Sequence, residues 1–139
     1  MNCLSLNICG VNSTKKRGWV KEVCNENNVM FLGLQETRMT RIELFKIRSL
    51  WGNGNFDFAC STARGASGEA GLVEIPMGGR RYTRVDSSGG KMSRLDRFLV
   101  LEQLFDVLPD IQCIALTRRW SDHCPLLLKE YWLIMVNSF

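Results

Sequence analysis

The first 36 residues constrain the fold most, because they have the pattern of a strand, a helix and a second strand. Residues 2–9 alternate between polar and apolar side chains, which is the period of a β-strand. Ser13 or Thr14 can cap the helix that follows. That helix has one apolar stripe, and its lysines are expected to face water: Trp19, Val20, Val23 and Cys24 against Lys15, Lys16 and Lys21. Residues 29–34 are an unbroken apolar run, which predicts a buried strand.

The remaining pattern is one of short elements separated by turns. We expect helices over residues 41–50 and 101–108, a loop over 61–71, and strands over residues 56–60, 81–85, 95–100, 112–116 and 125–128. The strands at 81–85 and 95–100 would flank a turn at residues 86–90. A chain of 139 residues has room for one core. Short strands mixed with two or three helices predict a single α+β or layered α/β domain.

Charge and cysteine content indicate the compartment and the kind of partner. The net charge is only +4, but arginines cluster late in the chain, at positions 80, 81, 84, 94, 97, 118 and 119. Such clusters suit a phosphate backbone, although for charge clusters alone a solvated face is the favoured explanation. None of the six cysteines forms a C-x-x-C pair, and the N-terminus does not resemble a signal peptide. We therefore expect free thiols, an intracellular protein and no membrane partner; residues 131–139 are too short to span a bilayer.

Three places in the sequence have the character of a chemical site. Asn7 ends the first predicted strand, and Glu36 closes the second, where a carboxylate is a natural ligand for a hard cation. His123 is the only histidine, and imidazole can act as an acid, as a base or as a partner of phosphate near neutral pH. Each also has an ordinary explanation: a turn asparagine, an exposed strand end, or a structural histidine.

Four motifs occur in order: Leu-Asn at Asn7, Leu-Gln-Glu-Thr at Glu36, Ser-Arg-Leu-Asp-Arg-Phe-Leu-Val at Asp96, and Ser-Asp-His-x-Pro at His123. This ordered set resembles the endonuclease/exonuclease/phosphatase superfamily. The surrounding text, such as Phe-Leu-Gly-Leu-Gln-Glu-Thr-Arg and Arg-Trp-Ser-Asp-His-Cys-Pro, is similar to the endonuclease domains of plant LINE-type (non-LTR) retrotransposons. The resemblance covers residues 1–129 and implies a two-sheet β-sandwich flanked by helices.

The resemblance also implies roles for individual residues. Asn7 and Glu36 would form the metal site, with Glu36 as the direct ligand of Mg²⁺ and Mn²⁺ as an alternative ion. His123 would contact the scissile phosphate, Asp96 would orient His123, and Asp122 would lie beside the metal or its waters. From their place in the arginine cluster, Arg118 and Arg119 are expected to contact nucleic acid.

The chain departs from the family's pattern in its middle. The family normally has several further strands and helices, with an Asp-x-Asn motif whose aspartate activates the attacking water. Here the sequence runs from Gly68 directly toward Leu72, and no Asp-x-Asn lies between Glu36 and Asp96. Arg84 stands where tryptophan is usual, and residues 130–139 no longer resemble the family. We therefore expect an incomplete sandwich over 1–129 with a junction near 68–72, followed by an unrelated tail; a retroelement remnant or a gene prediction that skipped sequence would explain both.

The sequence thus predicts a Mg²⁺-dependent DNA endonuclease domain in degenerate form, with little or no activity. The main alternative is a catalytically inactive remnant that still binds nucleic acid through its arginines. A phosphatase that acts on small phosphoesters is a weaker alternative, because the sequence around the motifs resembles that of retroelements. We expect a monomer, with DNA as its partner and the nucleus as its location if it is functional.

Overall fold

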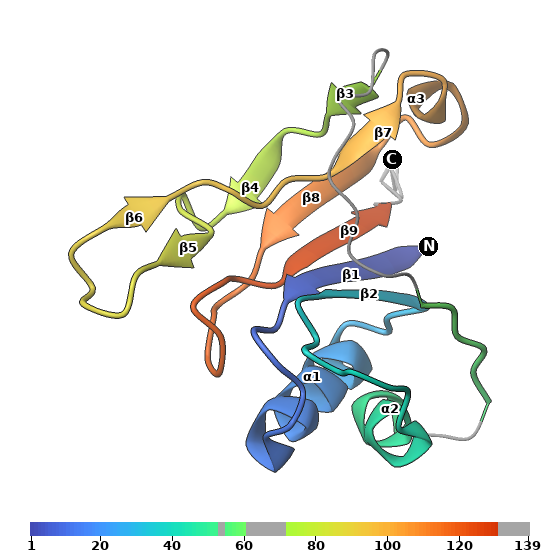
Figure 1. Ribbon diagram of the computed structural model, residues 1–139. Coiled ribbons are helices and arrows are strands. Elements are labelled where there is room, and N and C mark those ends of the chain that lie inside the picture. Colours follow the sequence, from blue (N-terminus) through green and yellow to red (C-terminus); the bar gives the residue numbers. More distant parts are fainter. Residues whose placement is uncertain (53–54, 61–71, 131–139) are drawn as a thin grey trace, which may run out of the picture.

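The protein is a mixed α/β fold built on a central five-stranded sheet (Figure 1). The computed structural model describes residues 1–52, 55–60 and 72–130. Its elements are, in chain order, β1 (Asn2–Asn7), α1 (Thr14–Glu26), β2 (Phe31–Gln35), α2 (Leu44–Trp51), β3 (Leu72–Glu74), β4 (Met77–Gly79), β5 (Arg84–Val85), β6 (Met92–Ser93), β7 (Leu99–Leu101), α3 (Leu104–Val107), β8 (Ile111–Ala115) and β9 (Leu126–Glu130). The predicted mixture of short strands and helices is confirmed. The predicted loop, most of the expected junction and nearly all of the expected tail lie outside the described residues.

The order of strands in the central sheet is β2-β1-β9-β8-β4. β1 and β2 are parallel, as are β8 and β4, whereas β9 runs antiparallel to both of its neighbours. A parallel pair needs a crossover connection, and α1 supplies it between β1 and β2. The ends of β1 and β2 therefore lie side by side, with Asn7 paired to Gln35.

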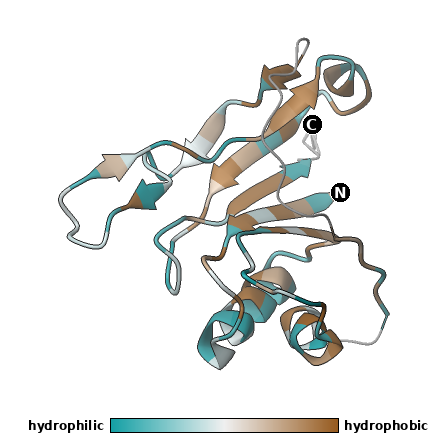
Figure 2. Ribbon diagram, viewed as in Figure 1, coloured by the Kyte–Doolittle hydropathy of each residue, from teal (hydrophilic) through white to brown (hydrophobic). Residues whose placement is uncertain are grey.

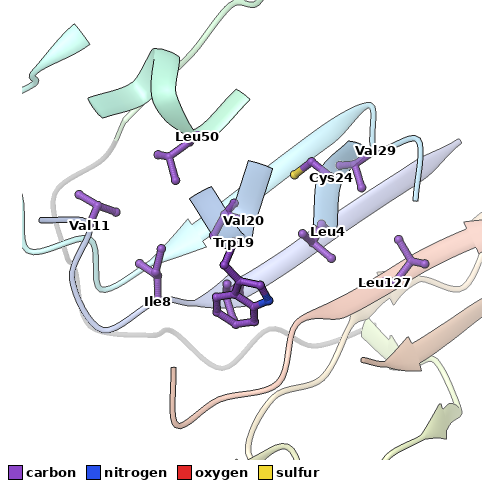
Figure 3. Close-up of a cluster of buried hydrophobic side chains, with 10 residues drawn as sticks. Leu4, Ile8, Val11, Trp19, Val20, Cys24, Val29, Leu50 and Leu127 are labelled. Atoms are coloured by element: carbon purple, nitrogen blue, oxygen red, sulfur yellow. The ribbon is translucent and has the colours of Figure 1, made fainter. Parts of the chain in front are cut away.

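One face of this sheet packs against α1 and α2, as Figure 3 shows. Ser13 caps α1, since its Oγ accepts a hydrogen bond from the amide of Lys16. The apolar stripe predicted for this helix packs on alternate residues of β1, and the buried core here includes Leu4, Leu6, Ile8, Trp19, Val20, Cys24 and Leu127. Gly52, in the left-handed conformation at φ 90°, ends α2. Burial of these side chains fixes the position of the β1–β2 pair.

The opposite face carries a second, smaller core. Figure 2 shows most of β7 and β8 in the hydrophobic colours. The buried members come from the central sheet and from the segment after β3: Cys3, Ile75, Ile111, Cys113, Ala115, Cys124, Leu126 and Leu128. Phe98 and Val100 pack against them. The two-stranded sheet β3–β7 thus supplies part of a second layer.

Two predicted strands differ from the structure. Residues 56–60 are not a strand: they are mostly exposed, and within the described ranges no strand pairs with them. β2 is not buried as its apolar run predicts, because it lies at the edge of the sheet and packs on the helices with one face only. Phe31, on its other face, is 64% exposed.

Two further predictions needed correction. Lys16 does not face water; it is half-buried, and its Nζ donates to the carbonyls of Ile8 and Cys9 at 2.8 and 2.9 Å, because the first turn of α1 lies over the end of β1. The predicted strands at 81–85 and 95–100 shrink to β5 and β7, and they do not pair with each other. β5 pairs with β6 across the turn at 86–90, where the amide of Asp86 donates to Lys91 O at 2.9 Å and brings the two strands together.

No helix among the residues described is both long and apolar enough to cross a membrane.

Candidate functional site

Asn7 and Glu36 are brought together by the parallel pairing of β1 and β2. The loops that follow these strands stay hydrogen-bonded, because the amide of Ile8 donates to Gln35 O at 3.1 Å and the amide of Gly10 donates to Glu36 O at 2.8 Å. Cys9 and Glu36 both have positive φ, at 51° and 52°. Left-handed backbone costs a non-glycine residue roughly 1–3 kcal/mol and is common at functional sites. The chain thus holds Cys9 and Glu36 in strained backbone conformations at the end of the sheet where Asn7 also lies.

The segment before β9 brings Asp122 and His123 to the same end. The Oγ of Ser121 donates to Asn7 O at 2.6 Å and accepts from the amide of His123 at 3.2 Å. On the other side, the amide of Val85 donates to Asp122 O at 3.0 Å. Asp122 is therefore fastened between the end of β1 and β5.

His123 and Asp96 form a buried pair. The imidazole Nδ1 lies 2.8 and 3.0 Å from the two carboxylate oxygens of Asp96, and the histidine side chain is only 9% exposed. Thr83, which is fully buried, positions this carboxylate: its Oγ1 accepts from the amides of Leu95 and Asp96, both at 3.0 Å. With Nδ1 donating to Asp96, a neutral imidazole presents the lone pair of Nε2 to the rest of the site.

Cys9 lies at the centre of the predicted residues. Its Sγ is 3.0 Å from Asp122 Oδ1, 3.3 Å from Asn7 Oδ1 and 3.8 Å from Glu36 Oε2. Burial, and then the hydrogen bond and negative charge of Asp122, raise the pKa of the Cys9 thiol above its ordinary value. The thiol is therefore protonated at neutral pH and donates to a carboxylate.

Arg84 balances the charge of Asp122. Its Nε donates to Asp122 Oδ2 at 3.1 Å, which leaves Oδ1 directed at Cys9. Burial alone would raise the pKa of Asp122, but the hydrogen bonds from Cys9 and Arg84 outweigh burial and lower that pKa below its ordinary value. Asp122 is thus a carboxylate at neutral pH.

An open cavity of about 550 Å³ begins at Cys9 and Asp122 and continues along basic residues. Arg118, Arg119 and Trp120 line it. The ammonium of Lys15 and the guanidinium of Arg119 lie 5.2 and 5.8 Å from the Trp120 ring centroid. The two arginines predicted to contact nucleic acid therefore adjoin the carboxylate site rather than lying on another face.

The donor atoms allow two kinds of cation. Oxygens from Asn7, Glu36 and Asp122 all lie within 3.8 Å of one point, the sulfur of Cys9, and oxygen donors suit Mg²⁺. The sulfur itself, with Asp122 and His123, forms a set that suits a softer ion. The residues fit a divalent cation, and the thiol is the one member that a magnesium site does not need.

All five residues predicted for the metal and the chemistry belong to one connected group: Asn7, Glu36, Asp96, Asp122 and His123, with Cys9 among them. We call these six residues the Cys9 cluster. Cys9 was not predicted from sequence, because a cysteine near an apolar run is usually a small buried hydrophobic residue. The roles of Thr83 and Ser121 were not predicted either, since hydroxyls that bond to distant backbone have no local sequence pattern. The sequence singled out Arg84 as part of the arginine cluster and as a departure from the resemblance, but it did not predict the ion pair with Asp122.

Comparison with family models, with curated proteins and with solved structures finds no match to this chain. The site is therefore interpreted from its own residues and geometry.

Proposed function

We propose that this chain is a degenerate phosphodiesterase domain of the endonuclease/exonuclease/phosphatase superfamily, of the LINE retrotransposon type, descended from a Mg²⁺-dependent DNA endonuclease. One observation carries the proposal. Five residues chosen by sequence motif, from four segments spread over residues 7–123, lie within one cluster, joined by hydrogen bonds and by a 3.9 Å contact between Asp122 Oδ1 and His123 Nε2. Motifs that matched by chance would have no reason to meet at one end of a sheet.

In the proposed phosphodiester hydrolysis, each residue of the site has a distinct role. Asn7 and Glu36 supply oxygen ligands for Mg²⁺, which when bound offsets the negative charge that develops on the phosphate. The Nε2 atom of His123 contacts a phosphate oxygen, while Asp96 fixes the tautomer and orientation of the ring. Arg118 and Arg119 lie along the adjoining cavity, where they neutralise neighbouring phosphates of DNA.

The incomplete second layer supports the idea that the middle of the domain is missing. A two-sheet sandwich would cover the face of the β1–β2 edge that points away from the helices. Phe31 on that face is 64% exposed, whereas its parallel neighbour Cys3 is buried in the smaller core. The absent segment would also carry the Asp-x-Asn motif. Losing the group that activates water typically costs about 10²- to 10⁴-fold in rate, so little or no hydrolysis is expected.

The test is a gain of function. The middle segment of an intact plant LINE endonuclease, inserted between Gly68 and Leu72, is expected to restore Mg²⁺-dependent nicking of supercoiled plasmid. His123→Ala in the same insertion should abolish nicking, and Glu36→Gln should remove Mg²⁺ binding measured by calorimetry. A well-folded insertion protein that binds Mg²⁺ but does not nick DNA would contradict the proposal.

A second candidate function is metal-independent nucleic-acid binding by a catalytically inactive remnant, active in the nucleus as a monomer. The observation that favours it is the cavity lined by Arg118, Arg119 and Trp120, with the charged groups of Lys15 and Arg119 over the Trp120 ring. Filter binding with EDTA present separates the two functions. Binding without metal, weakened by Arg118→Gln and Arg119→Gln but not by Arg48→Gln on the exposed side of α2, supports the remnant; loss of all binding in EDTA contradicts it.

A further inference from the structure

We propose that the Cys9 cluster is a zinc site, in which Cys9 Sγ, Asp122 Oδ1 and His123 Nε2 are the protein ligands and water takes the fourth position. The inference rests on the donor atoms alone and holds whether or not the chain hydrolyses phosphodiesters. It assigns to Cys9 a role that neither a magnesium site nor a nucleic-acid surface provides.

The three donor atoms are already close to the spacing of a tetrahedral site. They come from three different side chains and lie within 4.8 Å of one another. Sγ is 3.0 Å from Asp122 Oδ1, and Oδ1 is 3.9 Å from His123 Nε2. Zinc bonds of ordinary length in tetrahedral geometry hold neighbouring donor atoms about 3.3–3.6 Å apart. The two printed separations differ from this spacing by a few tenths of an ångström, and the third, from Sγ to Nε2, is at most 4.8 Å, so side-chain rotations are needed to complete the site.

The surroundings orient each ligand as zinc sites require. Asp96 holds Nδ1 of His123, and this carboxylate–histidine arrangement leaves Nε2 free to bind metal and makes it more basic. Arg84 engages Oδ2 of Asp122 and so leaves Oδ1 for the ion. At 3.9 Å, Asp122 Oδ1 lies too far from His123 Nε2 for a hydrogen bond. The buried imidazole nitrogen therefore faces a carboxylate oxygen to which it is not hydrogen-bonded.

The chemistry of the donors distinguishes zinc from magnesium. A thiolate is a soft ligand that binds Zn²⁺ strongly, whereas Mg²⁺ takes oxygen ligands and keeps several waters. Zinc binding replaces the S–H bond of Cys9 by an S–Zn bond, and the proton leaves to the solvent. The short contact from Sγ to Asp122 is then replaced by coordination of both atoms to the same ion.

Protection of the thiol tests the proposal without any substitution. The full chain is alkylated with iodoacetamide with or without Zn²⁺ or Mg²⁺, and labelling of each cysteine is measured by peptide mass spectrometry. Zn²⁺ should slow the labelling of half-buried Cys9 and leave exposed Cys60 unchanged, and Mg²⁺ should protect neither. Equal labelling of Cys9 with and without saturating Zn²⁺ would overturn the proposal.

Cobalt spectroscopy provides a second and independent readout. Co²⁺ bound in place of Zn²⁺ should give a sulfur-to-metal charge-transfer band that Cys9→Ser removes and the matched variant Cys60→Ser retains. Asp96→Asn should retain the band and weaken Zn²⁺ binding by about 10- to 100-fold, since it disturbs only the residue that orients His123. A band that survives Cys9→Ser would place the thiolate ligand elsewhere and contradict the assignment. If Cys9→Ser does not fold, the protection experiment on the unaltered chain decides alone.

Glu36→Gln separates this inference from the proposed function. Glu36 is a ligand for Mg²⁺ in the proposed function but not for zinc, so the variant should lose Mg²⁺ binding and keep zinc protection of Cys9. Zinc protection in a chain that never binds Mg²⁺ supports the zinc site and contradicts the magnesium site. Mg²⁺ binding that depends on Glu36, without zinc protection of Cys9, does the reverse.

Discussion

Replacing Thr83 by valine should destabilise the protein far more than its small change in shape suggests. Thr83 is fully buried, and its Oγ1 is the common acceptor for the amides of Leu95 and Asp96, each at 3.0 Å. Valine fills the same space but cannot accept a hydrogen bond. Both amides would then be partly buried without an acceptor, which costs about 1–1.5 kcal/mol each at the low end of the usual range. The free energy of unfolding should fall by about 2–3 kcal/mol.

Thermal denaturation followed by circular dichroism measures this loss. An unfolding entropy of about 2.1 cal/mol/K per residue over 139 residues is about 0.29 kcal/mol/K, so the melting temperature should fall by about 7–10 °C. The matched control is Thr83→Ser, which keeps the hydroxyl and loses one methyl group, worth about 1 kcal/mol. A valine variant as stable as the serine variant would contradict this prediction, because the hydroxyl would then contribute only about as much as the lost methyl group, about 1 kcal/mol.

Three further predictions concern other parts of the structure. Arg17→Met should lower the free energy of unfolding by about 1–3 kcal/mol in urea titrations, since buried Arg17 donates to the carbonyls of Val11 and Asn12 at 2.6 and 2.8 Å; an unchanged midpoint would show that water replaces it. Ser88→Ala should raise the pKa of Asp86, measured by NMR, because hydrogen bonds from the Ser88 hydroxyl and then the Lys91 amide lower that pKa below its ordinary value. These bonds stabilise the β5–β6 turn at neutral pH, and the stabilisation is lost as the pH falls through the pKa of Asp86. Burial raises the pKa of Cys24 and Cys113 to about 11, so at pH 8 both should be alkylated only on unfolding, long after exposed Cys60, and early labelling of either would contradict their burial.

The elements that sequence predicts well are those whose pattern is local. The strand, helix and strand of the first 36 residues follow from hydrophobic period and from the Ser13 cap, and each depends on contacts between near neighbours. Residues 56–60 have a similar apolar content but form no strand, since a strand also needs a partner that the local sequence does not contain. The exposure of β2 has the same origin, because an edge position depends on which other strands are present in the sheet.

The candidate site divides in the same way. Asn7, Glu36 and His123 could be selected because each follows or precedes a predicted strand, and ordered motifs added Asp96 and Asp122. Their convergence depends on the pairing of β1 with β2 and of β1 with β9, which no single motif encodes. Cys9 could not be selected as a site residue from sequence. Its backbone is left-handed and its thiol lies close to three side chains, and neither feature can be predicted from the local sequence.

The geometry of the Cys9 cluster is maintained by the fold itself, independently of any reaction. Asp96 is held by buried Thr83, Asp122 by Arg84, and His123 through Ser121, whose hydroxyl also binds the end of β1. These bonds stabilise the folded chain, so the proposed loss of the water-activating residue would leave the cluster in place. Cys9 is the member of the cluster that the proposed Mg²⁺ chemistry does not use. A thiol within 3.0–3.8 Å of three side-chain oxygens and beside a carboxylate-oriented imidazole favours a softer ion than Mg²⁺, and competition between Zn²⁺ and Mg²⁺ for Cys9, Asp122 and His123 measures that preference directly.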